Sequence, residues 1–250
     1  MLDSESGVAS PVQELISSEI LVAIGLTTAF AGGAWLLRGV TVSGALAGYA
    51  IALAVYLSRG IGGFLVLVSV FLVAWLTTRI GYQRKQQLGT AENARGRSAA
   101  QVIANLGAAA GFCIAGSTTG NPNFFVAGMA AFAEAASDTA ASECGQAWSQ
   151  RAYIITTLRP VPAGSNGGIS LPGTLAAIVA ATLVSGIAAG VGVLPASSVP
   201  IAASAAVLGT IIDSLLGATL ETRGVMNNNA VNLAGTTAAG LLALVFIRFQ

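Results

Sequence analysis

Carboxylate side chains gather at two places in this chain, although charged residues are otherwise scarce. The stretch AEAASDTAASECG (residues 133–145) holds Glu134, Asp138 and Glu143, and the stretch DSLLGATLE (213–221) begins with Asp213 and ends with Glu221. Glu134 and Asp138 are four residues apart and Asp213 and Glu221 are eight apart, so each pair shares one face of a helix. Such acids could hold Mg²⁺, which favours carboxylate oxygens together with water and substrate phosphates.

The composition around these acids is that of an integral membrane protein. Of 250 residues, 54% are hydrophobic and 8% are charged, and the mean hydropathy is +0.78. A soluble domain carries about 25% charged residues. The many Ala, Gly, Ser and Thr residues favour close helix packing in lipid. We therefore predict an all-α, polytopic membrane helix bundle with no nucleic-acid partner. The absence of histidine excludes His-based acid–base chemistry and His metal ligands.

Eight segments approach the roughly 20 apolar residues that a transmembrane helix requires. They lie at about residues 19–37, 40–57, 61–79, 100–117, 123–142, 173–194, 199–220 and 229–247. We expect about eight transmembrane helices, with seven or nine as the alternatives, because two segments are short and the last is polar at its start.

The basic residues predict the orientation of this bundle. With eight spans, nine of the eleven Lys and Arg residues fall on one side: Arg38, Arg79, Arg84, Lys85, Arg95, Arg97, Arg151, Arg159 and Arg223. Because positively charged loops stay cytoplasmic, that side is predicted to be cytoplasmic and both termini external. The chain then consists of an external segment, residues 1–18, and a single transmembrane domain, residues 19–250. Its long cytoplasmic loops are residues 80–99 and 143–172.

The predicted cytoplasmic face also gathers amides, hydroxyls and glycines. The residues concerned are Gln101, Asn105, Ser165, Asn166, Gly167, Gly168, Asn228 and Asn232. Glycines before a helix leave backbone N–H groups free to bind an anion, so GSNGGIS (164–170) suits a phosphate. It is neither a Walker A loop nor a GxGxxG fingerprint. A single acid at this face could merely pair with a loop arginine, but four carboxylates together favour phosphate chemistry.

Five blocks in this order resemble one integral membrane family. They are GRSAAQVIANLG (96–107), SDTAASECG (137–145), ITTLRPVPAGSNGGIS (155–170), DSLLGATLE (213–221) and NNNAVN (227–232). The family was formerly of unknown function and includes the plant phytyl-phosphate kinase. The resemblance implies phosphoryl transfer from a nucleotide, with CTP expected, to an isoprenyl monophosphate such as phytyl or geranylgeranyl phosphate. Where the family often has Trp after the Asp-Thr pair, this chain has Ala140.

Residue chemistry assigns roles for such a reaction. Asp138, Glu143 and Asp213 are expected to hold Mg²⁺, with Glu221 assisting directly or through water. Arg159 and the backbone of residues 165–168 are expected to bind phosphates. Further candidates for the acceptor phosphate or the nucleotide are Arg95, Arg97, Gln101, Asn105, Asn228 and Asn232. We take Asp138, Asp213 and Arg159 as the catalytic candidates.

Two other functional classes have to be weighed against a kinase. An ion-coupled secondary transporter could coordinate its coupling ion with the same acids, but transport sites lie near the membrane midplane. A CDP-alcohol phosphotransferase would also use Mg²⁺ and carboxylates, yet its closely spaced DGxxAR…GxxxDxxxD pattern is absent. The expected location is a bacterial or archaeal plasma membrane, with the active site on the cytoplasmic face and lipid as a partner.

Overall fold

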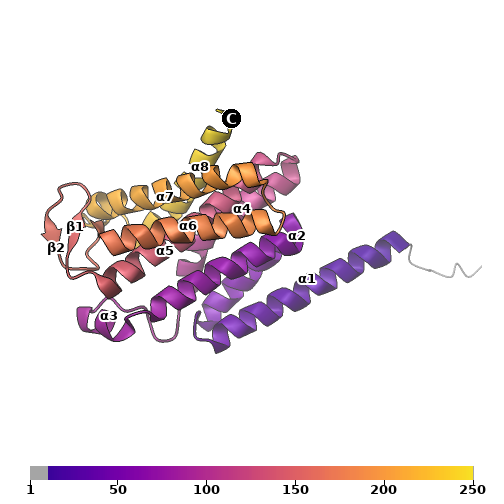
Figure 1. Cartoon of the computed structure of the whole chain (residues 1–250). Helices are drawn as coiled ribbons and strands as arrows, with labels where there is room; N and C mark the ends of the chain where they lie inside the picture. The colour runs from indigo at the N-terminus through magenta and orange to yellow at the C-terminus, as the bar shows by residue number, and fades with distance from the viewer. Residues whose placement is uncertain (1–10, 250) are drawn as a thin grey trace, which may run out of the picture.

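A computed structural model describes the backbone of residues 11–249 and the side chains of residues 18–249. Most of the predicted external segment, residues 1–10, lies outside this range. The helices are α1 (Pro11–Leu36), α2 (Val42–Arg79), α3 (Tyr82–Leu88), α4 (Ala99–Thr119), α5 (Asn123–Trp148), α6 (Leu171–Gly190), α7 (Val199–Leu216) and α8 (Asn228–Ile247). A 3-10 turn (Ala196–Ser198) precedes α7, and a π-helical turn, η2 (Gly217–Glu221), follows it. The predicted all-α membrane bundle is confirmed (Figure 1).

The predicted number of membrane spans is wrong. Among the described residues, six helices are long and apolar enough to cross a membrane, not about eight. The predicted spans 40–57 and 61–79 together form the 38-residue α2, which counts as one candidate span although it consists of two helical halves joined at Gly60. The predicted span 123–142 falls in α5, which is less apolar than the other long helices because it carries acids and small polar residues. The protein is nevertheless an integral, multi-pass membrane protein.

Helix α2 reverses its direction at Gly60, where φ is 65° and ψ is −160°. This left-handed conformation suits a residue without a β-carbon. The rings of Tyr56 and Phe64 lie 6.3 Å apart, whereas eight residues of straight helix span about 12 Å. Ala45, which precedes Gly60, and Val70, which follows it, line the same small cavity, so the two halves of α2 face each other. The two halves of α2 therefore lie antiparallel to each other.

Helix α5 is the core of the bundle. It packs against α2, α4, α6, α7 and α8, and 18 of its 26 residues are buried. Most of these side chains are alanine, glycine or serine, which allow neighbouring helices to come close. Hydroxyls add specific links, since Ser137 Oγ donates to Ala177 O of α6 at 3.1 Å and lies 3.0 Å from Thr210 Oγ1 of α7. Ser137 therefore connects α5 by hydrogen bonds to two of its neighbours, α6 and α7.

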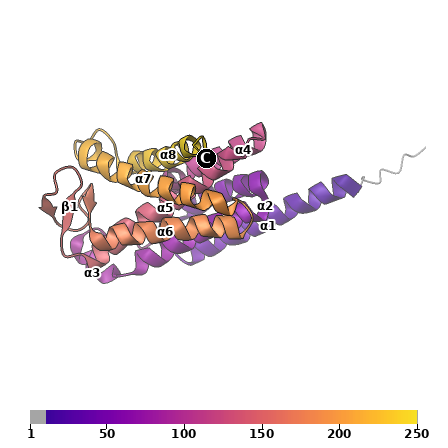
Figure 2. The same ribbon diagram turned by 45° about the horizontal axis from the view of Figure 1, so that its top comes forward.

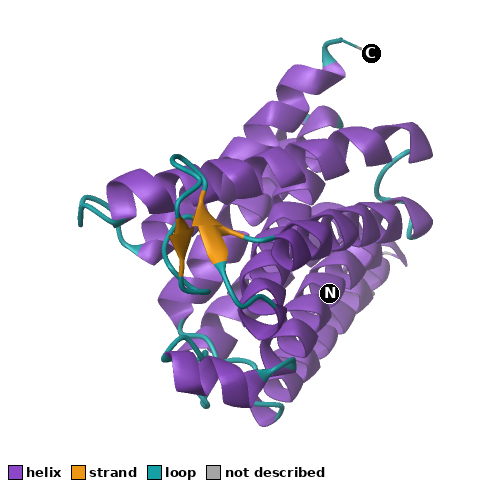
Figure 3. Cartoon of the chain, turned by 60° about the vertical axis from the view of Figure 1, so that its left-hand side comes forward, coloured by secondary structure: helices purple, strands orange, loops and turns teal. Residues whose placement is uncertain are grey.

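The long loops meet at one end of the bundle (Figures 1 and 2). Helix α3 forms part of the first loop. The second loop carries three short antiparallel strands in the order β2-β1-β3: β1 (Ala152–Ile154), β2 (Pro160–Val161) and β3 (Gly168–Ile169). Figure 3 shows this small sheet in front of the helix ends. We call this the loop end; the side of the membrane on which it lies stays a prediction.

A buried ion pair fastens the first loop to α5. Lys85, the only lysine of the chain, is fully buried, and its Nζ pairs with Glu143 Oε2. The same ammonium donates to Thr78 O at 2.7 Å, and Glu143 Oε1 accepts from Thr78 Oγ1 at 3.0 Å. One charge pair thus connects α3, the end of α2 and the end of α5.

Replacing Lys85 by methionine should destabilise the protein by about 3 kcal/mol, because it leaves a buried carboxylate without a partner. Removing both charges in Lys85→Met/Glu143→Gln should recover much of that loss. The measurement is unfolding in mixed micelles by titration with a denaturing detergent. Arg84→Met is the matched control, because Arg84 is half-buried and donates only to the neutral carbonyls of Ala147 and Ser149. Equal losses for the Lys85 and Arg84 variants would contradict a dominant ion pair.

Candidate functional site

A cavity of about 450 Å³ opens at the loop end, and one face of α5 forms its floor. Asp138, Ser142 and Gln146 follow one another at intervals of four and all line it. Four-residue spacing keeps side chains on one helix face, and the burial of α5 leaves only its end open. The Asp138 carboxylate therefore faces the cavity and not lipid.

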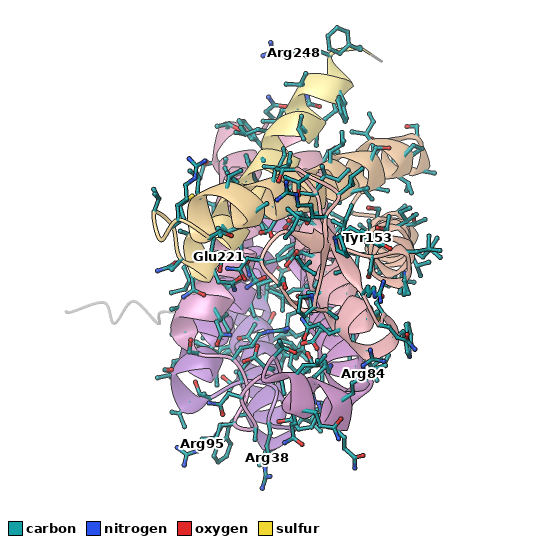
Figure 4. All side chains as sticks on the ribbon, turned by 90° about the vertical axis from the view of Figure 1, so that its left-hand side faces the viewer. Arg38, Arg84, Arg95, Tyr153, Glu221 and Arg248 are labelled. Atoms are coloured by element: carbon teal, nitrogen blue, oxygen red, sulfur yellow. The ribbon has the colours of Figure 1, made fainter. Side chains whose placement is uncertain are left out.

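The end of α7 forms the second wall. Asp213, Ser214, Gly217 and Glu221 line the cavity, and the last two belong to the π-helical turn η2. Single π turns inside helices occur frequently at functional sites. Glu221, labelled in Figure 4, is half-buried, whereas Asp213 Oδ2 is buried against Gly235 of α8. The two carboxylate stripes predicted from the sequence thus face one cavity.

The start of α4 supplies the third wall with Arg97, Gln101 and Asn105. Ser98 and Gln101 form a capping box, which fixes where α4 begins. Glu92 accepts from Gln101 Nε2 at 3.2 Å and lies 3.6 Å from Arg97 Nε. Asn105 is linked across the cavity to α8, because Asn232 Nδ2 donates to its Oδ1 at 3.4 Å. Arg97 thus lines the cavity, and its guanidinium stays half-buried beside Glu92.

The glycine-rich turn of the second loop covers the cavity on the side opposite to the floor formed by α5. Residues 165–168 all line it, and Gly168 N donates to Ser165 O at 2.9 Å to close the turn. Gly167 has a φ of 69°, and a β-carbon there would lie 2.5 Å from Ala218 N of η2. Only glycine fits this contact, so the turn is docked directly on the π-helical end of α7.

The carboxylates can be tested for their fit to a metal ion. Asp138, Asp213 and Glu221 line one cavity, and Asp213 Oδ2 is buried without a hydrogen-bond partner. Within residues 18–249, no three acids or cysteines are grouped closely enough to hold a metal alone. Mg²⁺ commonly takes one or two carboxylates and completes its shell with water and substrate phosphates. The residues fit that open kind of site and not a cage made of protein alone.

Two other acids of α5 have different surroundings. Glu143 borders the cavity, but both of its oxygens are engaged by Lys85 and Thr78. Glu134 is 1% exposed and its Oε1 has no hydrogen-bond partner. A β-carbon on Gly235 would lie 2.7 Å from Glu134 Oε1 and 3.3 Å from Asp213 Oδ2, so these oxygens are within about 6 Å of each other. Glu134 therefore lies beneath Asp213, below the cavity floor.

Not every residue expected at the site reaches the cavity. Arg97, Gln101, Asn105, Asn228 and Asn232 and the turn 165–168 line it. Arg95 and Arg159 do not line it, and both are exposed. Arg159 follows the bend between β1 and β2, and Figure 4 shows Arg95 pointing outward from the edge of the molecule. Proximity in sequence to a lining residue does not bring either guanidinium to the site.

Several lining residues were not expected from the sequence. Glu92 lies in a loop and is found only through its contacts with Gln101 and Arg97. Gln146 continues the four-residue stripe of Asp138 and Ser142, and its buried Oε1 has no hydrogen-bond partner. Extending that spacing by one step could have identified Gln146, whereas the position of Glu92 depends on how the first loop folds back.

Comparison with known proteins supplies the family. The model of the family described as "Integral membrane protein DUF92" matches residues 25–240, which is most of the chain. The chain belongs to this family. An uncharacterized membrane protein of Synechocystis is 31% identical over 79% of each chain. The chloroplastic protein VTE6 of Arabidopsis thaliana is 25% identical over 98% of this chain and 78% of its own. An uncharacterized membrane protein of Methanocaldococcus jannaschii is 30% identical over 72% of this chain and 74% of its own. No solved structure matches the chain.

Replacing Gly167 by alanine should detach the turn from η2, because the new methyl group overlaps Ala218. Trypsin cleavage after Arg151 reports this opening, since Ala152 is 3% exposed in the docked loop. We expect cleavage to be several-fold faster. Gly192→Ala is the control: its φ of 74° carries the same strain, about 1 kcal/mol, but no atom lies within 4 Å of the added carbon. Equal cleavage rates for both variants would contradict the docking contact.

Proposed function

We propose that this protein is a membrane-embedded, Mg²⁺-dependent kinase. It transfers the terminal phosphoryl group of a nucleoside triphosphate, with CTP expected, to an isoprenyl monophosphate such as phytyl or geranylgeranyl phosphate. The observation that carries the proposal is the single cavity in which Asp138, Asp213 and Glu221 face Arg97 and the glycine turn. Membership of the family to which the signature blocks pointed supports the same reaction.

The composition of the cavity suits phosphoryl transfer, in which a protein mainly positions reactants and neutralises charge. Asp138 and Asp213 would hold Mg²⁺, with Glu221 acting directly or through water. When bound, the ion supplies positive charge between the phosphates. Arg97 and the amides of Gln101 and Asn105 would donate to phosphate oxygens. The turn 165–168 would cover the phosphates from the side of the loop.

The acceptor needs little help from a base. A phosphate monoester is largely dianionic at neutral pH because its second pKa is about 6. One of its oxygens attacks the terminal phosphorus of the nucleotide and forms a new P–O bond. The bond to the leaving oxygen breaks, which releases a nucleoside diphosphate and the isoprenyl diphosphate. The lack of histidine in the chain is therefore compatible with this chemistry.

A second candidate function rests on Glu134. An acid that is 1% exposed, whose Oε1 has no hydrogen-bond partner and lies close to Asp213, resembles the ion site of a secondary transporter. The lining of the cavity favours the kinase, because its polar residues gather at the loop end of the bundle. A flux measurement in liposomes, made beside the kinase assay, separates the two functions.

Asp138→Asn and Asp213→Asn should each reduce turnover at least about 100-fold, because each removes a carboxylate that would hold the Mg²⁺ ion, and the ion is what neutralises the phosphates. The assay supplies purified protein, Mg²⁺, labelled CTP or ATP, and geranylgeranyl monophosphate, and measures the diphosphate. Glu19→Gln is the matched control, since it makes the same kind of change on an exposed position of α1. Near-normal rates in both Asp variants would refute the metal assignment.

Arg97 and Arg95 allow a second, internal comparison. Arg97→Gln should raise the KM for the acceptor or the nucleotide about tenfold, because it removes a charge-assisted contact worth about 1.5 kcal/mol. Arg95→Gln should leave both constants within a factor of two, since Arg95 does not line the cavity. A larger effect at Arg95 than at Arg97 would show that the phosphates bind outside this cavity.

A further inference from the structure

A second, apolar cavity of about 70 Å³ lies between α1, α2, α4 and α5. Its walls include Phe30 of α1, Gly44, Gly48 and Leu67 of α2, and Leu106 of α4. The two halves of the α2 hairpin both contribute to it. Glycines in its wall leave it open, because no atom lies within 4 Å of the place where a β-carbon on Gly48 would stand.

This apolar cavity adjoins the polar one. Arg97, Gln101, Asn105 and Thr139 line both. These four residues therefore form a boundary, with carboxylates and the glycine turn on one side and aliphatic and aromatic groups on the other. Such a boundary suits an amphiphile with an anionic head and a hydrocarbon tail.

The position of Arg97 at this boundary is fixed by the backbone. Residues 39–41, between α1 and α2, form a short parallel bridge with Arg97. Thr41 N donates to Arg97 O at 2.9 Å, and Arg97 N donates to Gly39 O at 3.0 Å. Gly96 allows this approach, because a β-carbon there would overlap the backbone of residues 39 and 40. A guanidinium is thereby held where the apolar cavity meets the polar one.

Helix α1 provides a route from this cavity to lipid. It packs against α2 through Phe30, whose ring lies 5.6 Å from Phe64 and 5.4 Å from Phe71. Much of its remaining surface is exposed, and Figures 1 and 2 show it at the periphery, diverging from the bundle. The outer wall of the apolar cavity is thus a single helix with lipid behind it.

We propose that the apolar cavity binds the beginning of the isoprenyl tail, with the acceptor phosphate beside Arg97, Gln101 and Asn105. The cavity is too small for a whole C20 chain, so the remainder of the tail passes α1 into the bilayer. This inference rests on the proposed function, because it takes a phosphate-bearing prenyl chain as the occupant. It adds where the beginning of the tail lies and which position of α2 lies beside it.

Gly48 is the position at which a larger side chain should obstruct the tail. Gly44 lies against Arg97 O, and Gly48 is one helical turn, about 6 Å, farther from the phosphate. A leucine at position 48 would therefore fill the space of the second isoprene unit and spare the first. Gly48→Leu needs no backbone shift at the β-carbon.

The experiment compares Gly48→Leu with Gly186→Leu, a change on the exposed face of α6 where the β-carbon is equally free. KM and kcat are measured with dimethylallyl (C5) and geranylgeranyl (C20) monophosphates. We expect Gly48→Leu to raise the KM for C20 about tenfold or more and to leave the C5 constants unchanged. Gly186→Leu should change neither. Gly48→Ala, which adds only the β-carbon, should fall between wild type and Gly48→Leu.

A binding readout separates failure of this inference from failure of the kinase function. A C20 monophosphate with a diazirine on its second isoprene unit should label α1, α2 or α4 in wild type and in Gly186→Leu, but weakly in Gly48→Leu. That labelling would support the tail site even if no diphosphate formed, an outcome that would refute the kinase alone. Normal turnover of C20 by Gly48→Leu, or labelling elsewhere in the wild type, would overturn the tail site and leave the kinase standing.

Discussion

The enclosure of α5 is the constraint on which the rest of this structure depends. Acids within a membrane bundle cost several kcal/mol when they face lipid, and α5 carries Glu134, Asp138 and Glu143. Surrounding α5 with five other helices keeps all of these carboxylates away from hydrocarbon. Close packing around α5 requires small residues, so the alanine and glycine content follows from the position of the acids.

The same enclosure determines where polar chemistry can occur. Along most of α5 the neighbouring helices pack closely and leave only the small apolar cavity, whereas room for water and polar ligands opens where the helices end. The π turn of α7, the capping box of α4 and the turn at Gly167 each shape one wall of that opening. The loops are therefore structural parts of the site, fastened at Lys85 on one side and at Gly167 on the other.

The sequence was sufficient to predict the class of fold and many of the polar residues that line the candidate cavity. The low content of charged residues predicted a membrane helix bundle. The four-residue spacing of polar side chains predicted the helix faces that carry Asp138 and Asp213, and both faces line one cavity. The span count differs for two reasons. The two apolar halves of α2 are continuous through Gly60 and count as one span, and the acids and small polar residues of α5 make it less apolar than the other long helices. The orientation of the loop arginines could not be predicted from the sequence either. Nothing in the residues around Arg95, Arg97 and Arg159 shows which guanidinium turns inward, because the backbone pairing of residues 39–41 decides it.

That backbone pairing has a mechanical consequence. The segment that joins α1 to α2 and the segment that carries Arg97 share main-chain hydrogen bonds, and main-chain bonds cannot be relieved by a change of rotamer. If α1 tilts away from α2 near Phe30, residues 39–41 act as the hinge, and the backbone of Arg97 is hydrogen-bonded to that hinge. A movement of α1 that opens the lipid-facing wall would then also move Arg97.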